Sequence, residues 1–225
     1  MEDGKVMSKL NILYEDNHII VVEKKANILS QSDITGDKDL HTMVKEYIKE
    51  KYHKPGNVYL GLVHRLDRPV GGLMVFAKTS KAASRLSKQI KEKTFKKYYL
   101  AIVNGILKEN QKELKDYLKR LPNGNTIISD DGKLAILNYK VLKKSKEENK
   151  TLVEVDLKTG RHHQIRVQFS NIGHPLCGDN RYGKEDKTQI ALYAYKIEFI
   201  HPTTKEKLTF TNLPPKKDYW TLFTL

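Results

Sequence analysis

One aspartate in this chain could act as a nucleophile or as a base. Asp67 lies between Arg65 and Arg68, in the segment His-Arg-Leu-Asp-Arg-Pro. A carboxylate with two guanidinium groups nearby is expected to stay ionised, because opposite charge favours the charged form. An ionised carboxylate can attack a carbon atom or accept a proton without help from a metal ion. The plain alternative is a turn in which Asp67 accepts hydrogen bonds and both arginines are solvated.

A second candidate is Arg166, on a predicted helix. The segment 159–169 places Ile165 and Phe169 at helical spacing, and Gly173 ends the pattern. Arg166 directly follows Ile165, at the margin of the apolar face. A partly buried guanidinium needs a carboxylate partner, because a desolvated charge without one is expensive. Asp67 would supply it; otherwise Arg166 is a surface cation on an amphipathic helix.

No metal site is expected. His162 and His163 are adjacent, whereas two histidines that bind zinc from one helix stand four residues apart. Cys177 is the single cysteine, which leaves no cysteine-based metal site and no intramolecular disulfide. A chain without disulfides fits a reducing compartment, and no apolar run reaches the roughly 20 residues that cross a bilayer. We therefore expect a cytoplasmic protein that does not bind membranes.

Two apolar segments flank Asp67 and predict a hairpin of buried strands around it. Pro69 fixes one backbone angle, and Gly71 and Gly72 permit angles closed to other residues, so a short rigid turn is expected between the strands. The flanking apolar residues are Val58, Tyr59, Leu60, Leu62 and Val63 before the turn, and Leu73, Met74, Val75, Phe76 and Ala77 after it.

The rest of the chain alternates short strands with amphipathic helices. Strands are predicted at 10–14, 19–23, 96–105, 151–157, 190–200 and 208–213, and helices from Asp39 to about Tyr52 and after Thr79 or Ser80. Tyr98 and Tyr99 must point to opposite faces of their strand. Residues 108–148 predict only a turn-rich excursion with strands near 135–142, and the charge run 143–150 predicts a solvated loop.

The charge balance points to a polyanionic partner. The chain has 225 residues and a formal net charge of +14, and 39% of its residues are hydrophobic, enough for a folded core. Such an excess of lysine and arginine favours binding to nucleic acid and makes binding sensitive to salt. A lysine-rich proteome or an anionic membrane surface would explain the same excess.

Three segments together resemble the RluA family of RNA pseudouridine synthases. The first is His-Arg-Leu-Asp, followed by an apolar strand that ends Ala-Lys-Thr. The second places Tyr99 before Ala101, Val103 and Gly105. The third reads Thr-Gly-Arg-x-His-Gln-Ile-Arg-Val, with Ile-Gly-His-Pro-Leu-x-Gly-Asp-x-x-Tyr-Gly after it. The three occur in the family's order and span about half of the chain.

The resemblance implies an α+β fold, the pseudouridine-synthase fold. Its mixed, mostly antiparallel β-sheet carries flanking helices and a central catalytic cleft, in one catalytic domain over 10–225 after a leader at 1–9. The resemblance makes Asp67 the catalytic nucleophile and Tyr99 the active-site tyrosine that stacks on uracil. It makes Arg166 the contact of the aspartate. The further substrate-binding residues would be His64, Arg65, Arg161, His163 and Gln164.

The implied reaction isomerises specific uridines in ribosomal or transfer RNA to pseudouridine, without a cofactor. A uridine within a helix is inaccessible, so the target base must flip out of the stack. Arg65 would fill the vacated space, or else form a plain salt bridge. A monomer is expected, and DNA is not an expected partner.

Two other classes of protein stay open. One is an RNA-binding protein that keeps the fold without catalysis, against which intact Asp67, Tyr99 and Arg166 argue. The other is a hydrolase or nuclease that uses Asp67 with His64 or His163. Such an enzyme usually needs clustered carboxylates or metal ligands, and the sequence shows none.

Overall fold

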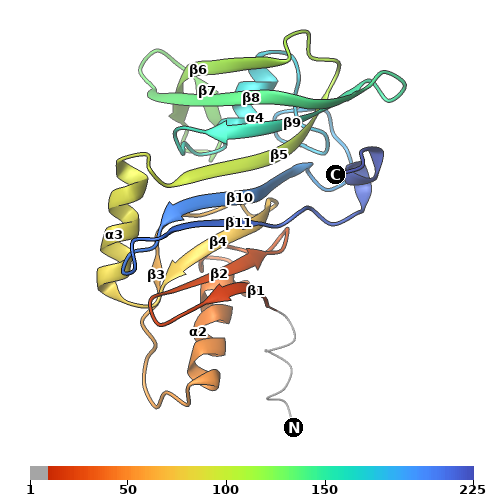
Figure 1. The fold of residues 1–225 in the computed structure, drawn as a ribbon. Helices are drawn as coiled ribbons and strands as arrows, with labels where there is room; N and C mark the ends of the chain where they lie inside the picture. The colour runs from red at the N-terminus through yellow and green to blue at the C-terminus, as the bar shows by residue number, and fades with distance from the viewer. Residues whose placement is uncertain (1–9) are drawn as a thin grey trace. The chain divides into compact units, whose positions relative to one another are not determined.

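The computed structural model describes residues 10–225, which form two compact units. The first unit holds the described residues up to Phe95 together with Lys196–Asn212, and the second holds Lys96–Tyr195 with Leu213–Leu225. Helices and antiparallel strands confirm the predicted α+β class (Figure 1). The expected leader at 1–9 lies outside the described residues. The single catalytic domain over 10–225 stays a prediction.

The first unit contains a sheet in the order β1-β2-β4-β10, in which β3 also pairs with β4 and β11 with β10. The predicted hairpin near the start is confirmed. Its turn is held by Asp16, whose Oδ1 accepts from the backbone N–H groups of His18 and Ile19, at 2.7 and 2.8 Å. The strands are β1 (Asn11–Glu15), β2 (Ile19–Lys24), β3 (Gly61–Leu62), β4 (Gly71–Ala77), the end of β10 (Leu192–Ile200) and β11 (Lys207–Thr211).

Two capped helices belong to this unit, as predicted. Helix α2 (Leu40–Lys51) begins after Asp39, whose Oδ1 accepts from the N–H of Thr42 at 2.9 Å. Helix α3 (Ser80–Lys91) begins after Thr79, whose Oγ1 accepts from the N–H of Ala82 at 3.1 Å. Each cap satisfies a backbone donor that the first turn of a helix leaves without a partner.

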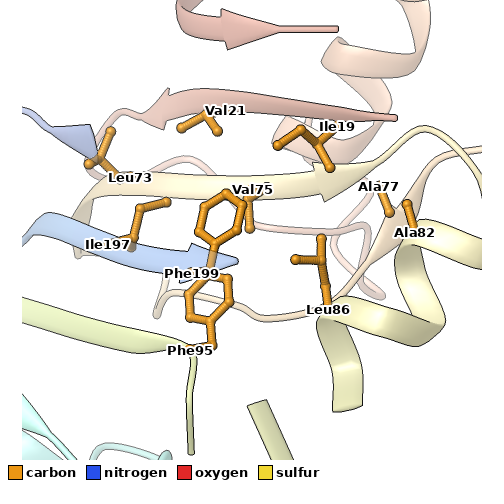
Figure 2. Close-up of a cluster of buried hydrophobic side chains, with 10 residues drawn as sticks. All are labelled: Ile19, Val21, Leu73, Val75, Ala77, Ala82, Leu86, Phe95, Ile197 and Phe199. Atoms are coloured by element: carbon orange, nitrogen blue, oxygen red, sulfur yellow. The ribbon is translucent and has the colours of Figure 1, made fainter. Parts of the chain in front are cut away.

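Strand β4 is buried on both faces, which explains its unbroken apolar sequence. On one face, Leu73, Val75 and Ala77 pack against Ala82 and Leu86 of α3, and against Phe95, Ile197 and Phe199 (Figure 2). On the other face, the ring of Phe76 lies 5.9 Å from that of His41 in α2. Burying each large side chain stabilises the unit by roughly 1.5–3 kcal/mol, so the Asp67 loop ends on a firmly packed strand.

The second unit holds an antiparallel sheet in the order β5-β9-β8-β6-β7. A short 3-10 helix, η1 (Asp218–Leu222), contributes the sole tryptophan, Trp220, to the buried cluster around Ile102. The elements are β5 (Lys96–Asn104), β6 (Gln111–Arg120), β7 (Thr126–Ile128), β8 (Lys133–Ser145), β9 (Lys150–Leu157), α4 (Gln164–Asn171) and the start of β10.

The solvated loop predicted for 143–150 is confirmed only as an exposed turn at 146–149. Strand β8 continues to Ser145, and Lys143, Lys144 and Ser145 pair with Leu152, Thr151 and Lys150 of β9. The end of β8 carries polar residues on both faces, so it lacks the alternation by which a half-buried strand is recognised. Strand β6 was not predicted for the same reason: its exposed positions are mostly charged.

Two further boundaries differ from prediction. Before Asp67 only Gly61–Leu62 forms a strand, although a longer one was expected from Val58 onward. The third helix begins at Gln164 rather than near Thr159, because His163 has the left-handed backbone angle φ of 53°. A residue in that conformation cannot continue a right-handed helix backward.

Candidate active site

The loop that carries Asp67 runs from the end of β3 to the start of β4. The N–H of Val70 donates to the carbonyl of Asp67 at 3.0 Å, which closes a turn with Arg68 and Pro69 at its centre. The expected rigid turn is therefore present. The two glycines follow it inside β4, where Gly72 has a φ of 129°, a conformation that favours glycine.

Ser30 clamps this loop beside the aspartate. Its buried Oγ donates to the carbonyl of Leu66 at 2.7 Å and accepts from the N–H of Leu66 at 3.1 Å. Leu66 is itself buried and directly precedes Asp67. Both backbone hydrogen-bonding groups of Leu66 are thus satisfied by one hydroxyl from a distant part of the chain, which holds the backbone at Asp67 in place.

Lys24 is a member of this site that the sequence analysis missed. Its side chain is fully buried at the end of β2, and Nζ donates to the carbonyls of Ile28 at 2.6 Å, Arg68 at 3.0 Å and Lys25 at 3.3 Å. Three acceptors require three donors, so this geometry calls for the charged ammonium form. Burial lowers the pKa of Lys24 to about 7, while the Asp67 charge opposes that shift and Arg68 adds to it.

The two arginines next to Asp67 in sequence are both exposed to solvent. Nη2 of Arg68 pairs with Oδ2 of Asp37 at 2.6 Å, and both side chains are about half exposed to solvent. Arg65 is exposed. Lys24 is a buried cation that interacts electrostatically with Asp67, and no sequence motif indicated it. The sequence held one indication of this role: Lys24 occupies an inward position of β2, on a face of the strand that is otherwise apolar.

His64 is built into the packing of β4. Its Nε2 accepts from the N–H of Val75 at 3.1 Å, and its ring lies 5.5 Å from that of Phe95. An accepting Nε2 places the proton of the neutral ring on Nδ1. This contact gives His64 a positioning role for the strand that follows Asp67.

In the second unit, Tyr99 and Tyr98 lie on opposite faces of β5, as predicted. Tyr99 is 7% exposed and pairs in register with Val155, which also pairs with Tyr139. The ring of Tyr139 lies 5.5 Å from that of Phe169 in α4. Residues paired across antiparallel strands share a face, so Tyr99 lies on the face that α4 covers.

Arg166 has a buried carboxylate partner within its own unit. Its Nε and Nη2 donate to the two oxygens of Asp179 at 2.9 and 2.7 Å, and the arginine is only 6% exposed. The Asp179 carboxylate also accepts from the N–H of Arg181 at 3.1 Å. A bidentate pair of this kind fixes the plane of the guanidinium group. Contact between Arg166 and Asp67, which lies in the first unit, stays a prediction.

A cluster of rings and guanidinium groups surrounds the start of α4. Nδ1 of His163 contacts the hydroxyl of Tyr182 at 2.7 Å, and the rings of His162 and His163 lie 3.7 Å apart. Burial lowers the pKa of His163 to about 3, and the positive charges of Arg166, His162, Arg181 and Arg120 add to this effect. His163 is therefore neutral at physiological pH.

The side chains of Arg161 and Gln164 stabilise the approach to α4. Nε of Arg161 donates to the carbonyl of Leu134 at 2.9 Å, and its N–H donates to Oε1 of Gln164 at 3.0 Å. The buried amide of Gln164 also accepts from Thr159 at 2.8 Å and donates to Gln168 at 3.0 Å. Substrate binding by these two residues stays a prediction.

Within residues 10–225, no group of three or more His, Cys, Asp or Glu side chains is placed to hold a metal ion. In the same part of the chain, no helix is long and apolar enough to span a membrane.

Comparison with known proteins identifies relatives across most of the chain. This chain is 36% identical over 203 residues to YhcT of Bacillus subtilis, which is named an uncharacterised RNA pseudouridine synthase. The match covers 88% of this chain and 66% of that protein. This chain is 37% identical over 213 residues to the ribosomal large subunit pseudouridine synthase C of Buchnera aphidicola subsp. Schizaphis graminum, covering 88% and 65%. The chain thus spans just under two thirds of the length of these relatives.

Solved structures confirm the predicted fold. Human RNA pseudouridylate synthase domain containing 1 matches with a TM-score of 0.75 and 24% identity, over 98% of this chain and 89% of that one. Human RNA pseudouridylate synthase domain containing 4 matches with a TM-score of 0.78 and 18% identity, over 97% and 92%. At these identities the likeness is one of fold.

The family model described as RNA pseudouridylate synthase matches residues 18–171. This segment covers well over half of the chain and contains Asp67, Tyr99 and Arg166. The chain therefore belongs to the RNA pseudouridylate synthase family.

Proposed function

We propose that this protein isomerises uridine to pseudouridine in RNA, with large-subunit ribosomal RNA as the first substrate to test. The family match that contains Asp67, Tyr99 and Arg166 in order is the observation that carries this proposal. A relative of Nitrosomonas europaea, 34% identical over 220 residues, covering 92% of this chain and 62% of that protein, is named ribosomal large subunit pseudouridine synthase D. Transfer RNA is the second substrate class to test. The net charge of +14 suits either polyanion.

The reaction conserves atoms and electrons. The bond from N1 of uracil to the ribose breaks, a bond from carbon 5 to the ribose forms, and carbon 5 loses its hydrogen while N1 gains a proton. No redox change or hydrolysis occurs, so a cofactor is not part of the proposal.

Asp67 is the proposed nucleophile. Its loop is held by Ser30 at Leu66, by Lys24 at the carbonyl of Arg68, and by the packed strand β4 that follows. Such restraint favours catalysis, because a carboxylate that is already in place loses little freedom when it reacts. Attack at the ribose, attack at the base and assistance to loss of uracilate would all use the same ionised carboxylate.

Tyr99 and Arg166 are the other proposed catalytic residues. Tyr99 would stack against the uracil ring and move a proton late in the reaction. Arg166 would hold the Asp67 carboxylate ionised, and its pair with Asp179 supports this role because it sets the guanidinium plane beforehand. The exposed Arg65, together with His64 and His163, would contact the RNA around the flipped nucleotide.

The test measures tritium released to water from ribosomal RNA that carries uridine tritiated at carbon 5. The wild type should release tritium, and Asp67→Ala should reduce release to background. RNA affinity should stay within about threefold, because Lys and Arg contacts to phosphates dominate binding. Asp130→Asn is the matched control, since Asp130 is an exposed aspartate of the second unit, and it should match the wild type.

Each result has a distinct reading. Release by Asp67→Ala at the wild-type rate would refute the nucleophile. If the wild type releases no tritium from unmodified ribosomal or transfer RNA, the proposed synthase activity is refuted, and an RNA-binding protein without catalysis is favoured. The salt dependence of binding would then still be steep.

A further inference from the structure

One lysine of the second unit lies on the same face of β5 as Tyr99. Lys97 precedes Tyr99 by two residues, and side chains alternate between the two faces of a strand, so both side chains belong to the face that α4 covers. Two residues advance about 6.6 Å along a strand, which is similar to the length of a lysine side chain. A nucleotide that stacks on Tyr99 is therefore close enough for its backbone to meet the Lys97 ammonium.

The ammonium of Lys97 has no partner in the described part of the chain. Among residues 10–225, no hydrogen bond or ion pair joins its Nζ to another group. Burial lowers the pKa of Lys97, and no carboxylate opposes this shift. Lys24, in contrast, donates to three carbonyls. A half-buried ammonium without a partner weakens a fold, so stability does not explain the presence of Lys97.

Gly160 leaves room beside this ammonium. A Cβ atom at residue 160 would lie 3.3 Å from Nζ of Lys97. Gly160 is exposed, and its φ lies outside the left-handed range, so the backbone does not require glycine at this position. What the glycine does provide is open space next to Nζ, at the surface of the unit.

The charges around this point favour an anion. Arg161 is exposed and directly follows Gly160. Asp156 lies on the opposite face of the sheet from Val155 and pairs with Lys158. The groups whose charges act on His163, at the start of α4, are all positive: Arg166, His162, Arg181 and Arg120. RNA carries an anionic phosphate at every nucleotide, and lysine binds phosphate as a point charge.

We propose that Lys97 binds a backbone phosphate of the RNA, next to the uridine whose ring stacks on Tyr99. Gly160 lets this phosphate approach the ammonium. The inference rests on the proposed synthase function and deepens it, because it assigns substrate binding to residues other than the proposed catalytic ones. Phosphate contacts set the position of a nucleic acid on a protein, so this contact would hold the backbone while the base lies against Tyr99.

The test uses hairpin RNAs that carry the modified uridine, once tritium release has mapped it. In a series of these RNAs, each phosphate within about two nucleotides of the uridine is replaced in turn by an uncharged methylphosphonate. Binding is measured with Asp67→Ala, which should not turn the RNA over. One of the replacements should weaken binding about tenfold, because it removes a charge-assisted contact.

A second substitution then shows whether Lys97 makes that contact. Lys97→Gln, added to Asp67→Ala, should weaken binding of the unmodified RNA about tenfold. The methylphosphonate at the contacted phosphate should cause no further loss, because the contact is already absent. Equal effects of every methylphosphonate on both proteins would overturn the proposal. A fall in kcat by Lys97→Gln alone, without a loss of affinity, would place the lysine at the uracil ring and would also overturn it.

Two further variants separate this contact from general effects on binding. Gly160→Val keeps the charge of Lys97 but fills the space beside Nζ, so it should reproduce the loss at the same phosphate. Lys146→Gln removes an exposed lysine of the same unit, and it should leave the effect of each methylphosphonate unchanged. A wild-type pattern in Gly160→Val would contradict the approach of a phosphate at this point.

Denaturant unfolding tests for a structural role instead. Lys97→Met removes a charge that has no partner within residues 10–225, so its free energy of unfolding should equal or exceed that of the wild type. A lower value would show that Lys97 serves the fold, and would overturn the proposal. If the wild type releases tritium but the methylphosphonate result fails, only the phosphate contact is refuted. No tritium release by the wild type would refute both.

Discussion

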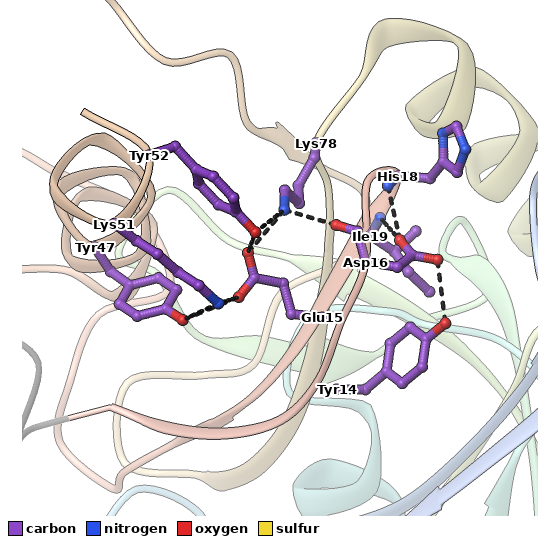
Figure 3. Close-up of polar contacts among 9 residues, drawn as sticks. All are labelled: Tyr14, Glu15, Asp16, His18, Ile19, Tyr47, Lys51, Tyr52 and Lys78. Atoms are coloured by element: carbon purple, nitrogen blue, oxygen red, sulfur yellow. Dashed lines mark hydrogen bonds and ion pairs between the residues drawn. The ribbon is translucent and has the colours of Figure 1, made fainter. Parts of the chain in front are cut away.

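Two lysines of the first unit have little exposed side chain, Lys24 at 0% and Lys78 at 9%, and they differ in the groups that face the ammonium. Nζ of Lys78 pairs with Oε1 of Glu15 at 2.7 Å and donates to the carbonyl of Asp16 at 2.6 Å (Figure 3). Nζ of Lys24 is bonded to three backbone carbonyls. A carboxylate neutralises Lys78 directly, whereas carbonyls solvate Lys24 without cancelling its charge.

The network around Glu15 fastens separate elements of the unit together. Glu15 ends β1, and its carboxylate also accepts from Lys51 at 2.6 Å, Tyr47 at 2.9 Å and Tyr52 at 2.8 Å, in or next to α2 (Figure 3). Burial alone would raise the pKa of Glu15, but these hydrogen bonds outweigh it and lower the pKa to about 2. Every charge in this network has a local partner, which is the mark of a structural site.

The surroundings of Lys24 follow a different principle. The charge of Lys24 acts on Asp67 through space, and burial brings its pKa close to physiological pH. Strongly perturbed groups cluster at functional sites, because catalysis uses charges that the fold has not already neutralised. The contrast teaches that burial of a lysine by itself does not indicate function, and it makes Lys24 a better candidate for a functional role than Lys78, because no carboxylate is among the hydrogen-bond acceptors of Lys24.

The largest expected effect is that of Lys24→Met. The change removes the donor from three carbonyls and the positive charge near Asp67, so kcat should fall about a hundredfold as the loop shifts. Lys78→Met is the matched control and should lower the melting temperature while kcat/KM stays within about threefold of the wild type. Tritium release and thermal unfolding measure both. Similar losses of activity in the two folded variants would break the comparison.

The pH dependence of activity sharpens the same contrast. Because the pKa of Lys24 is about 7, the ammonium form is lost as pH rises through that value. Activity that needs this charge should therefore fall on the alkaline side of about pH 7. Lys24→Arg, whose guanidinium stays charged, should move that fall to higher pH wherever it remains active. An unchanged profile in Lys24→Arg would contradict the role of the charge.

The buried pair of Arg166 and Asp179 extends the comparison to the second unit. Arg166→Met leaves the Asp179 carboxylate without its buried cation and should lower the free energy of unfolding by about 3–5 kcal/mol. Arg166→Met combined with Asp179→Leu should regain much of that loss, since apolar replacement of a buried pair is often tolerated. If Arg166 also holds the Asp67 carboxylate ionised, the double variant should fold but release no tritium. Recovery of tritium release would instead show that the pair has only a structural role.

The smallest expected effect is that of Glu15→Gln, on stability alone. The folded pKa of about 2 lies below the ordinary value of 4.5, so the ionised group stabilises the fold above pH 4.5. This stabilisation, about 3 kcal/mol at most, is lost as pH falls from 4.5 through 2. In denaturant unfolding, the free energy of unfolding of Glu15→Gln should be lower than that of the wild type at pH 7 and equal to it near pH 2. An equal deficit at both pH values would contradict the ionic origin.

The sequence by itself determined the local elements and the identity of the three motifs. The caps at Asp39 and Thr79, the apolar faces of α2 and α3, and the run that forms β4 depend on residues close together in the chain. Local spacing is therefore enough to predict them. Strand β6 and the polar end of β8 were missed because pairing with neighbours, and not their own periodicity, holds them in the sheet.

Only the tertiary structure decided which groups surround the candidate catalytic residues. Ser30 and Lys24 reach the Asp67 loop from distant positions, and Asp179 pairs with Arg166, a partner that the sequence analysis did not name. Charges that are neighbours in sequence, such as Arg68, lie exposed and pair elsewhere. The physical reason is that burial strengthens an electrostatic interaction, and burial depends on the packing of segments far apart in the chain.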